Sequence, residues 1–152
     1  MAFTEPNPQA IELSQASLTP EADALFEEGA RLYQQGSADS LRQAMQKLQQ
    51  ARVLYQQAGN QGSEAVCLLG IGSVYDALGE KQQALENYNQ ALLLSRAVGD
   101  HAGEARALNN IGGVYADLGK KQQALDFYNQ ALPLRRAVAI GAGEATTSNN
   151  IG

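Results

Sequence analysis

The chain has 152 residues and a formal net charge of −5, with 44% hydrophobic and 18% charged residues, a composition that fits one soluble domain with a packed core. The acidic balance disfavours nucleic acid and anionic membrane as partners, because both are bound mainly through Lys and Arg. No apolar run is long enough to span a bilayer, and the N-terminus lacks the basic start and apolar middle of a signal peptide, so we expect a cytoplasmic protein. One cysteine and one histidine disfavour disulfide, metal and redox chemistry, so we expect neither a metal nor a cofactor.

The first 18 residues precede the clearly patterned part of the chain. Asn7-Pro8 can open a short leading helix, and a loose arm over 1–18 is the alternative. Thr19-Pro20 is a favourable start for the first helix of the patterned part. From there on, apolar residues recur at a helical spacing. This spacing predicts helices, in chain order, over 21–35, 40–58, 62–77, 81–98, 101–117 and 121–138.

The junctions between these helices carry their own signals. Asn60 and Asp100 have short polar side chains that can cap the helix that follows each of them. Gly79 and Gly119 stand where a residue in the left-handed conformation can end the preceding helix at little steric cost. The chain is therefore expected to fold as helices joined by short turns.

The chain also repeats itself. Residues 61–100 and 101–140 align without a gap and are identical at 23 of 40 positions. A degenerate copy precedes them, and a further copy begins with Gly143. A period of 20–50 residues indicates a stack of similar units that share one continuous core. We therefore predict repeats over about 19–60, 61–100 and 101–140, and a half repeat over 141–152.

Small residues alternate with large ones at fixed slots in each copy, which lets two helices approach closely. The slots are filled by Leu68-Ile71-Gly72-Tyr75-Ala84-Tyr88-Ala91 and again by Leu108-Ile111-Gly112-Tyr115-Ala124-Tyr128-Ala131. This pattern resembles that of tetratricopeptide repeat (TPR) proteins. The resemblance implies an all-α fold, a right-handed superhelical solenoid of antiparallel helix pairs, and it implies a protein-binding scaffold and not an enzyme.

The 40-residue period and the amino-acid sequences of the repeats resemble those of particular branches of that family. The period is similar to that of kinesin light chains and of the Leu-Gly-Asn spindle-orientation scaffold. The phrases ALNNIGGVY and YNQALPLRRAV resemble bacterial arrays, frequent in cyanobacteria, that are often joined to a CHAT-type, caspase-like protease domain. A catalytic activity is therefore expected only if such an effector domain belongs to a larger parent protein.

The resemblance also implies a binding surface, because in such arrays the first helix of each repeat lines the concave side. The positions that face inward are counted from the glycine of the helix contact in each repeat, Gly72 or Gly112. The residues at these positions are polar and mixed in charge. These positions hold Glu27, Arg31, Gln34, Leu69, Ser73, Asp76, Arg106, Asn109, Asn110, Gly113, Asp117, Asn149 and Asn150. We expect them to bind a protein or peptide ligand.

The asparagine pairs in this set are similar to the asparagine ladder of O-GlcNAc transferase and kinesin light chain. An amide both donates and accepts hydrogen bonds, so it can hold a peptide backbone whatever the side chains of the peptide are. Asn110 and Asn150 match the ladder slot, whereas Gly70 interrupts it. The alternative is that these asparagines only solvate the helix face.

Other candidate sites have a structural explanation. Gly70-Ile71-Gly72 lacks the third glycine and the preceding strand of a dinucleotide fingerprint. Cys67 is expected to be a small, half-buried packing residue, and His101 a solvated residue at a helix start. The remaining carboxylates are expected to solvate helix faces without forming a convergent pair: Glu80, Glu86, Asp117 and Asp126.

The C-terminal end lacks the usual signals. Pro133 lies inside a predicted helix, where we expect a kink and not a break. Ala139-Ile140 replace the Gly-Asn or Gly-Asp of the earlier junctions, so we expect a hinge at 139–143 followed by a weakly held capping helix over 142–152. The uncovered face at this end suggests a homo-oligomer, formed either by end-to-end docking or by helix swapping.

Overall fold

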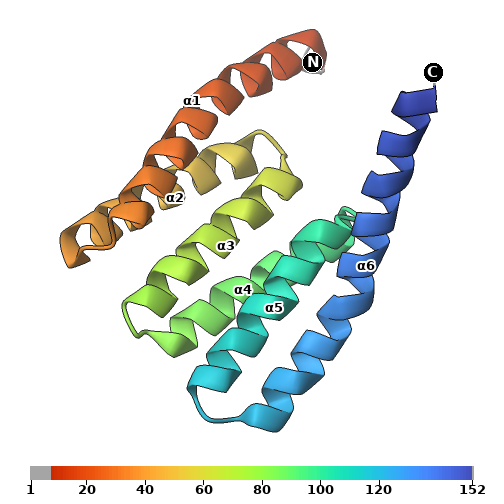
Figure 1. The fold of residues 1–152 in the computed structure, drawn as a ribbon. Coiled ribbons are helices and arrows are strands. Elements are labelled where there is room, and N and C mark those ends of the chain that lie inside the picture. Colours follow the sequence, from red (N-terminus) through yellow and green to blue (C-terminus); the bar gives the residue numbers. More distant parts are fainter. Residues whose placement is uncertain (1–7, 152) are drawn as a thin grey trace, which may run out of the picture.

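The computed structural model describes the backbone of residues 8–151 and the side chains of residues 19–142. Within residues 8–151 the chain forms six helices and no strand (Figure 1), so the all-α prediction is confirmed. The helices are α1 (Pro8–Gln35), α2 (Ala38–Gln57), α3 (Gln61–Ala77), α4 (Lys81–Ala97), α5 (His101–Asp117) and α6 (Lys121–Ile151).

The helices pack in consecutive antiparallel pairs, α1 with α2, α3 with α4 and α5 with α6 (Figure 1). Successive pairs stack because α2 packs on α3 and α4 packs on α5. Among the described residues, the first helices of neighbouring pairs also touch, α1 with α3 and α3 with α5, whereas α2 and α4 do not. The first helices therefore lie closer together than the second helices, and the array curves with α1, α3 and α5 on its concave side.

The turns between helices have the geometry that the sequence predicts. Gly79 and Gly119 adopt φ angles of +79° and +75°, in the left-handed region. Asn60 caps α3 by accepting a hydrogen bond from the backbone N–H of Ser63 at 3.0 Å. Asp100 caps α5 in the same way, with the N–H of Gly103 as donor at 3.0 Å. Both predicted caps are confirmed, and the short turns keep the paired helices antiparallel.

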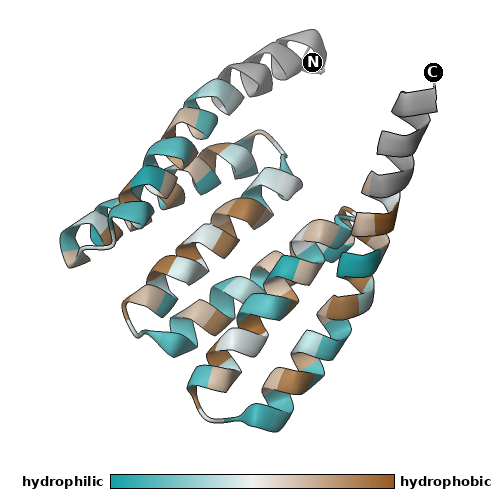
Figure 2. Ribbon diagram, viewed as in Figure 1, coloured by the Kyte–Doolittle hydropathy of each residue, from teal (hydrophilic) through white to brown (hydrophobic). Residues whose placement is uncertain are grey.

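The core lies between the helices, where the small slots face the large ones. A Cβ added to Gly72 would lie 2.5 Å from Cε1 of Tyr88, so only glycine allows this ring to pack against α3. Ala84 and Ala91 are fully buried beside it. Figure 2 shows hydrophobic and hydrophilic residues alternating along the helices. The alternation of small and large residues therefore sets the distance between paired helices.

Both ends of the array differ from the prediction. Helix α1 begins at Pro8 and continues through Pro20, so the predicted helix start at Thr19-Pro20 is wrong, and residues 8–18 are part of α1. Residues 8–19 are mostly good helix formers, and Pro20 removes only one backbone hydrogen bond from the helix.

Helix α6 likewise runs unbroken from Lys121 to Ile151. It passes through Pro133 without a break, as predicted. The predicted hinge at 139–143 and the separate capping helix over 142–152 are wrong, because the helix continues across both. Ala139 and Ile140 stand where the earlier junctions have a glycine and a capping residue, so the signals that end the earlier helices are missing at these two positions.

None of the helices, within the residues searched, combines the length and the hydropathy that a bilayer span requires.

Candidate functional site

A pocket of about 180 Å³ opens on the concave side of the array, between α1, α3 and α5. We call it the concave pocket. It is lined by Phe26 of α1, by Val66, Leu69, Gly70 and Ser73 of α3, and by Arg106 and Asn110 of α5. Three first helices thus contribute to one site, as expected for a groove that runs across successive repeats.

The concave pocket brings together four of the residues that the sequence placed in the groove: Leu69, Ser73, Arg106 and Asn110. Phe26, Val66 and Gly70 were missed. The repeat register carried a signal for two of them, because Val66 and Gly70 lie 40 residues before Arg106 and Asn110. Phe26 lies in the degenerate first copy, and its position at the pocket depends on how α1 sits against α3.

The floor of the concave pocket is held by the core beneath it. Leu69 is only 7% exposed and belongs to the main hydrophobic cluster. The Ser73 hydroxyl donates to the carbonyl of Leu69 at 2.9 Å and accepts from the hydroxyl of Tyr88 at 3.2 Å. Leu69 and Ser73 therefore shape the pocket, and their polar groups are already paired inside the protein.

The rim of the pocket is different. Arg106 is exposed and Asn110 is half-buried, and in the described part of the chain neither side chain makes a hydrogen bond or an ion pair. A guanidinium and an amide are thus presented to solvent above an apolar floor. These two groups are the ones in the concave pocket that remain available to a ligand.

Two predicted groove residues are instead engaged in ion pairs. The Lys81 ammonium lies 2.5 Å from Oδ1 of Asp76 and 2.9 Å from Oδ2 of Asp117. These hydrogen bonds raise the pKa of Lys81 above its ordinary value. The expectation that Asp117 forms no convergent pair is wrong, because it meets Asp76 at this ammonium. The contact joins the ends of α3 and α5 to the start of α4, and it engages both carboxylates while leaving the three side chains with one net negative charge.

The other predicted groove residues lie outside the concave pocket. Glu27, Arg31 and Gln34 are exposed along α1. Gly113 is half-buried, and a Cβ added there would lie 3.8 Å from the Tyr128 hydroxyl. The side chains of Asn149 and Asn150 lie outside the described residues.

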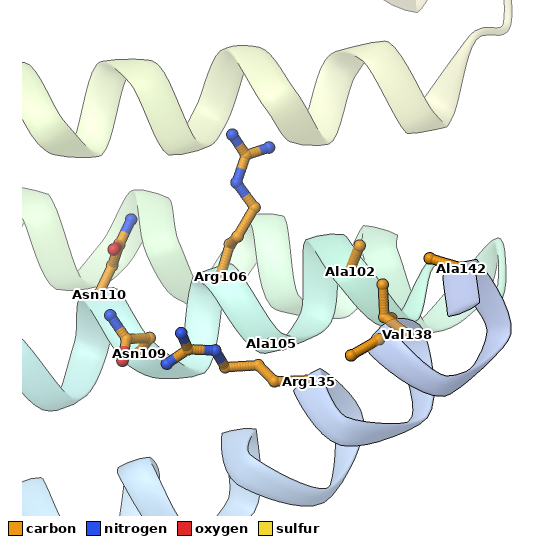
Figure 3. A pocket seen from close by; sticks show the side chains of 9 residues that line it. Ala102, Ala105, Arg106, Asn109, Asn110, Arg135, Val138 and Ala142 are labelled. Carbon is orange, nitrogen blue, oxygen red and sulfur yellow. The ribbon is translucent and has the colours of Figure 1, made fainter. Parts of the chain in front are cut away.

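A second pocket, of about 430 Å³, lies between α5 and α6, and we call it the terminal pocket (Figure 3). Figure 3 shows Arg135 reaching from α6 toward Asn109, and Arg106 pointing away from α6. Its lining is Ala102, Ala105, Arg106, Asn109, Asn110, Arg135, Val138, Ala139 and Ala142. Arg106 and Asn110 thus border both pockets, whereas Asn109 borders only the terminal pocket.

Cys67 and His101 are the remaining side chains that the sequence raised as candidates. Cys67 is fully buried, more than the half-burial we expected, and desolvation raises the pKa of its thiol to about 12. His101 is exposed at the start of α5, with Nδ1 3.9 Å from Oε2 of Glu104. Among the residues searched, no three metal-ligating side chains gather at one place.

Comparison with known proteins agrees with this architecture. The TPR domain of Arabidopsis FLU superposes with a TM-score of 0.71 at 18% identity, covering 79% of this chain and 98% of that one. MamA superposes with a TM-score of 0.62 at 26% identity, covering 80% of this chain and 62% of that one. No curated protein matches the chain. Residues 64–137 match the tetratricopeptide repeat family, and the whole described chain has an all-α fold of the TPR type.

Proposed function

We propose that this chain is a protein-interaction scaffold that binds an extended peptide in the concave pocket and catalyses no reaction. Domains of the TPR type generally act as scaffolds for protein–protein interactions, with the concave face as the binding surface. The observation that carries the proposal is the pair of polar side chains, Arg106 and Asn110 of α5, which have no partner among the described side chains and stand beside apolar residues of α1 and α3.

The chemistry of the pocket indicates what kind of peptide it fits. The Asn110 amide can donate to a peptide carbonyl and accept from a peptide N–H, and the Arg106 guanidinium suits a carboxylate. Phe26 and Val66 offer apolar contact beside them. Asp76 and Asp117 are both held by Lys81, whose charge balances one of the two carboxylates. A peptide with an acidic side chain next to an apolar one is therefore the expected ligand, in spite of the overall charge of −5.

The test is to select peptides against the immobilised chain from a displayed library and to measure the affinity of the best one by fluorescence anisotropy. Arg106→Ala, and the double change of Asn109 and Asn110 to Ala, should each weaken binding by about tenfold, the effect of losing one or two charge-assisted or amide hydrogen bonds. The melting temperature should stay within a few degrees of that of the parent, because exposed positions contribute little to the fold.

Matched controls are available on the second helices. Arg42→Ala on α2 removes an exposed arginine whose only ion pair, with Asp39, is itself exposed. Asn89→Ala on α4 removes an exposed asparagine. Neither change should alter the affinity. A loss of binding in these controls, with full binding in the Arg106 variant, would move the site to the convex side.

We also propose which branch of TPR proteins this chain is related to. The 40-residue period and the repeat phrases support a place in the branch that resembles kinesin light chains and bacterial CHAT-associated arrays. In that setting the array would recruit a partner for an effector domain in a larger protein, within the cytoplasm. The reading frame around the coding sequence tests this directly. The acidic charge supports neither nucleic acid nor membrane as the partner.

Self-assembly through the C-terminal end is the second candidate function. One observation favours it: α6 continues without a break to Ile151, and the terminal pocket lies open between α5 and α6. Such a contact would share Arg106 and Asn110 with the concave pocket, because both residues border the two pockets.

A further inference from the structure

We propose that residues 142–151 of one copy pack on the terminal pocket of a second copy, and that the exchange is reciprocal and produces a closed dimer. The proposal gives a specific geometry to the second candidate function and does not depend on peptide binding. Three features carry it: an uncovered stacking surface, a segment whose sequence fits that surface, and a junction that prevents the segment from folding back on its own chain.

The terminal pocket lies on a surface that is covered in the preceding repeat. Leu92 of α4 is 6% exposed because α5 packs over the α3–α4 pair. Its counterpart 40 residues later, Leu132, is 44% exposed. Leu69 is buried in the same way, whereas its counterpart Asn109 is exposed. The α5–α6 pair therefore presents the face on which a further first helix would stack.

The segment 142–151 has the sequence of such a helix. It reads AGEATTSNNI, and residues 102–111 at the start of α5 read AGEARALNNI, so seven of ten positions are identical. In α5 this stretch packs on the preceding pair with Ala105, Leu108 and Ile111 buried. Ser148 of the segment occupies the position that Leu108 has in α5. Asn109 of the surface occupies the position that Leu69 has in α3. Both sides of the proposed contact are therefore more polar than in the preceding repeat.

A polar contact recurs at the two earlier junctions between repeats, and the sequence supplies residues for the same contact at the C-terminal junction. The Gln56 amide donates to Oε1 of Glu64 at 2.7 Å, and Nε of Arg96 donates to Oε1 of Glu104 at 2.8 Å. Each contact joins the end of a second helix to the start of the next first helix, eight residues later. The next pair in this register is Arg136 and Glu144. Within the continuous helix α6 these positions are about 12 Å apart along the axis, so they cannot pair in the same helix.

The junction explains why a second copy supplies the segment. At the preceding junction, Gly99 adopts φ +70° and Asp100 caps α5. Ala139 and Ile140 occupy these two positions before the segment. A left-handed alanine is strained and isoleucine cannot cap, so the chain does not reverse. Figure 1 shows α6 projecting past α5 instead. Two such chains can cover each other's terminal pockets with one two-fold contact.

The first test uses charge reversal. Size-exclusion chromatography with light scattering over a dilution series should show a dimer in the parent chain. Arg136→Glu and Glu144→Arg should each weaken dimerisation by about tenfold, because each places like charges at both symmetric contacts. An equal mixture of the two variants should restore the dimer, since every contact in the heterodimer then joins opposite charges. A monomeric parent at all concentrations, or two variants that dimerise like the parent, would overturn the proposal.

The second test restores the turn. Ala139→Gly combined with Ile140→Asp recreates the Gly99-Asp100 junction, so the segment can fold back on its own chain and the dimer should become a monomer with unchanged helix content. Ala137→Gly, a helix glycine outside the junction, is the matched control and should leave the dimer in place. A dimer that persists in the double variant would show that the contact does not involve the exchanged segment. Asn110 borders both pockets, so the two ideas are separated by measuring peptide affinity on the Arg136→Glu variant, whose changed side chain lines neither pocket. Peptide binding that is kept while the dimer is lost distinguishes the two contacts.

Discussion

Tyr128 packs so closely against Gly112 that a Cβ on this glycine would stand 2.7 Å from Cε1 of the ring. The next residue, Gly113, is different, because a Cβ there would only make ordinary contact with the Tyr128 hydroxyl at 3.8 Å. Two adjacent glycines on one helix therefore have different roles. Gly112 sets the approach of α6 to α5, whereas Gly113 lies toward the concave side with room for a side chain.

We predict that Gly112→Ala destabilises the protein by about 1–3 kcal/mol, because the overpacking against Tyr128 exceeds the gain of about 1 kcal/mol in helix propensity. Gly113→Ala should be neutral or stabilising by up to about 1 kcal/mol, since it gains the propensity without the clash. Urea unfolding of both variants measures the difference. Equal effects of the two changes would contradict the close approach at Gly112.

The hydroxyl of Tyr88 provides a second test of the core. Tyr88 is 2% exposed and donates a hydrogen bond to Ser73. Tyr88→Phe should cost about 0.5–1.5 kcal/mol, the net value of one hydrogen bond, whereas Tyr88→Ala should cost about 3–5 kcal/mol. A double-mutant cycle with Ser73→Ala isolates the pair. Additive effects in that cycle would show that the two side chains do not interact.

The parts of the fold that repeat could be predicted from the sequence. The bounds of α3, α4 and α5 fall within one residue of the predicted helices, and the caps and packing glycines are where the pattern put them. Two copies of the same spacing constrain each other, because each slot must satisfy the same packing. The outer ends of α1 and α6 have no second complete copy, so local signals such as Thr19-Pro20 were misleading there.

The site was harder to predict, because its side chains pair across helices. Lys81 and Lys121 occupy the same slot, but Asp76 corresponds to Ala116, and Asp117 corresponds to Ala77. The contact between these two carboxylates and Lys81 therefore leaves no trace in the repeat pattern, although it engages two side chains that were expected in the groove. Which polar groups stay free for a ligand depends on such contacts, and these need the three-dimensional arrangement.

The start of α4 offers a stabilising change. Glu80 is the N-cap residue, yet its side chain makes no capping hydrogen bond, whereas Asn60 in the corresponding place before α3 does. Glu80→Asn should stabilise the protein by about 0.5–1 kcal/mol, because the shorter side chain can accept from an N–H of the first turn. Glu80→Ala serves as the control and should be close to neutral. A Glu80→Asn variant no more stable than the control in urea would show that this turn does not admit the capping geometry.

The buried thiol of Cys67 predicts how stability depends on alkaline pH. Desolvation, with a smaller contribution from Glu64, raises the pKa of Cys67 from 9.0 to about 12, while Arg52 acts in the opposite direction. The folded chain thus keeps the neutral thiol where the unfolded chain forms the thiolate. The stabilisation is complete below pH 9 and is lost as the pH rises from 9 toward 12, with a slope that approaches about 1.4 kcal/mol per pH unit.

Urea unfolding between pH 8 and 10 should show the onset of this loss, and Cys67→Ala should remove it. Ala107 fills the matching slot in the next repeat, so alanine is compatible with this position. A fall in stability that is the same in the alanine variant would assign the pH dependence to other groups.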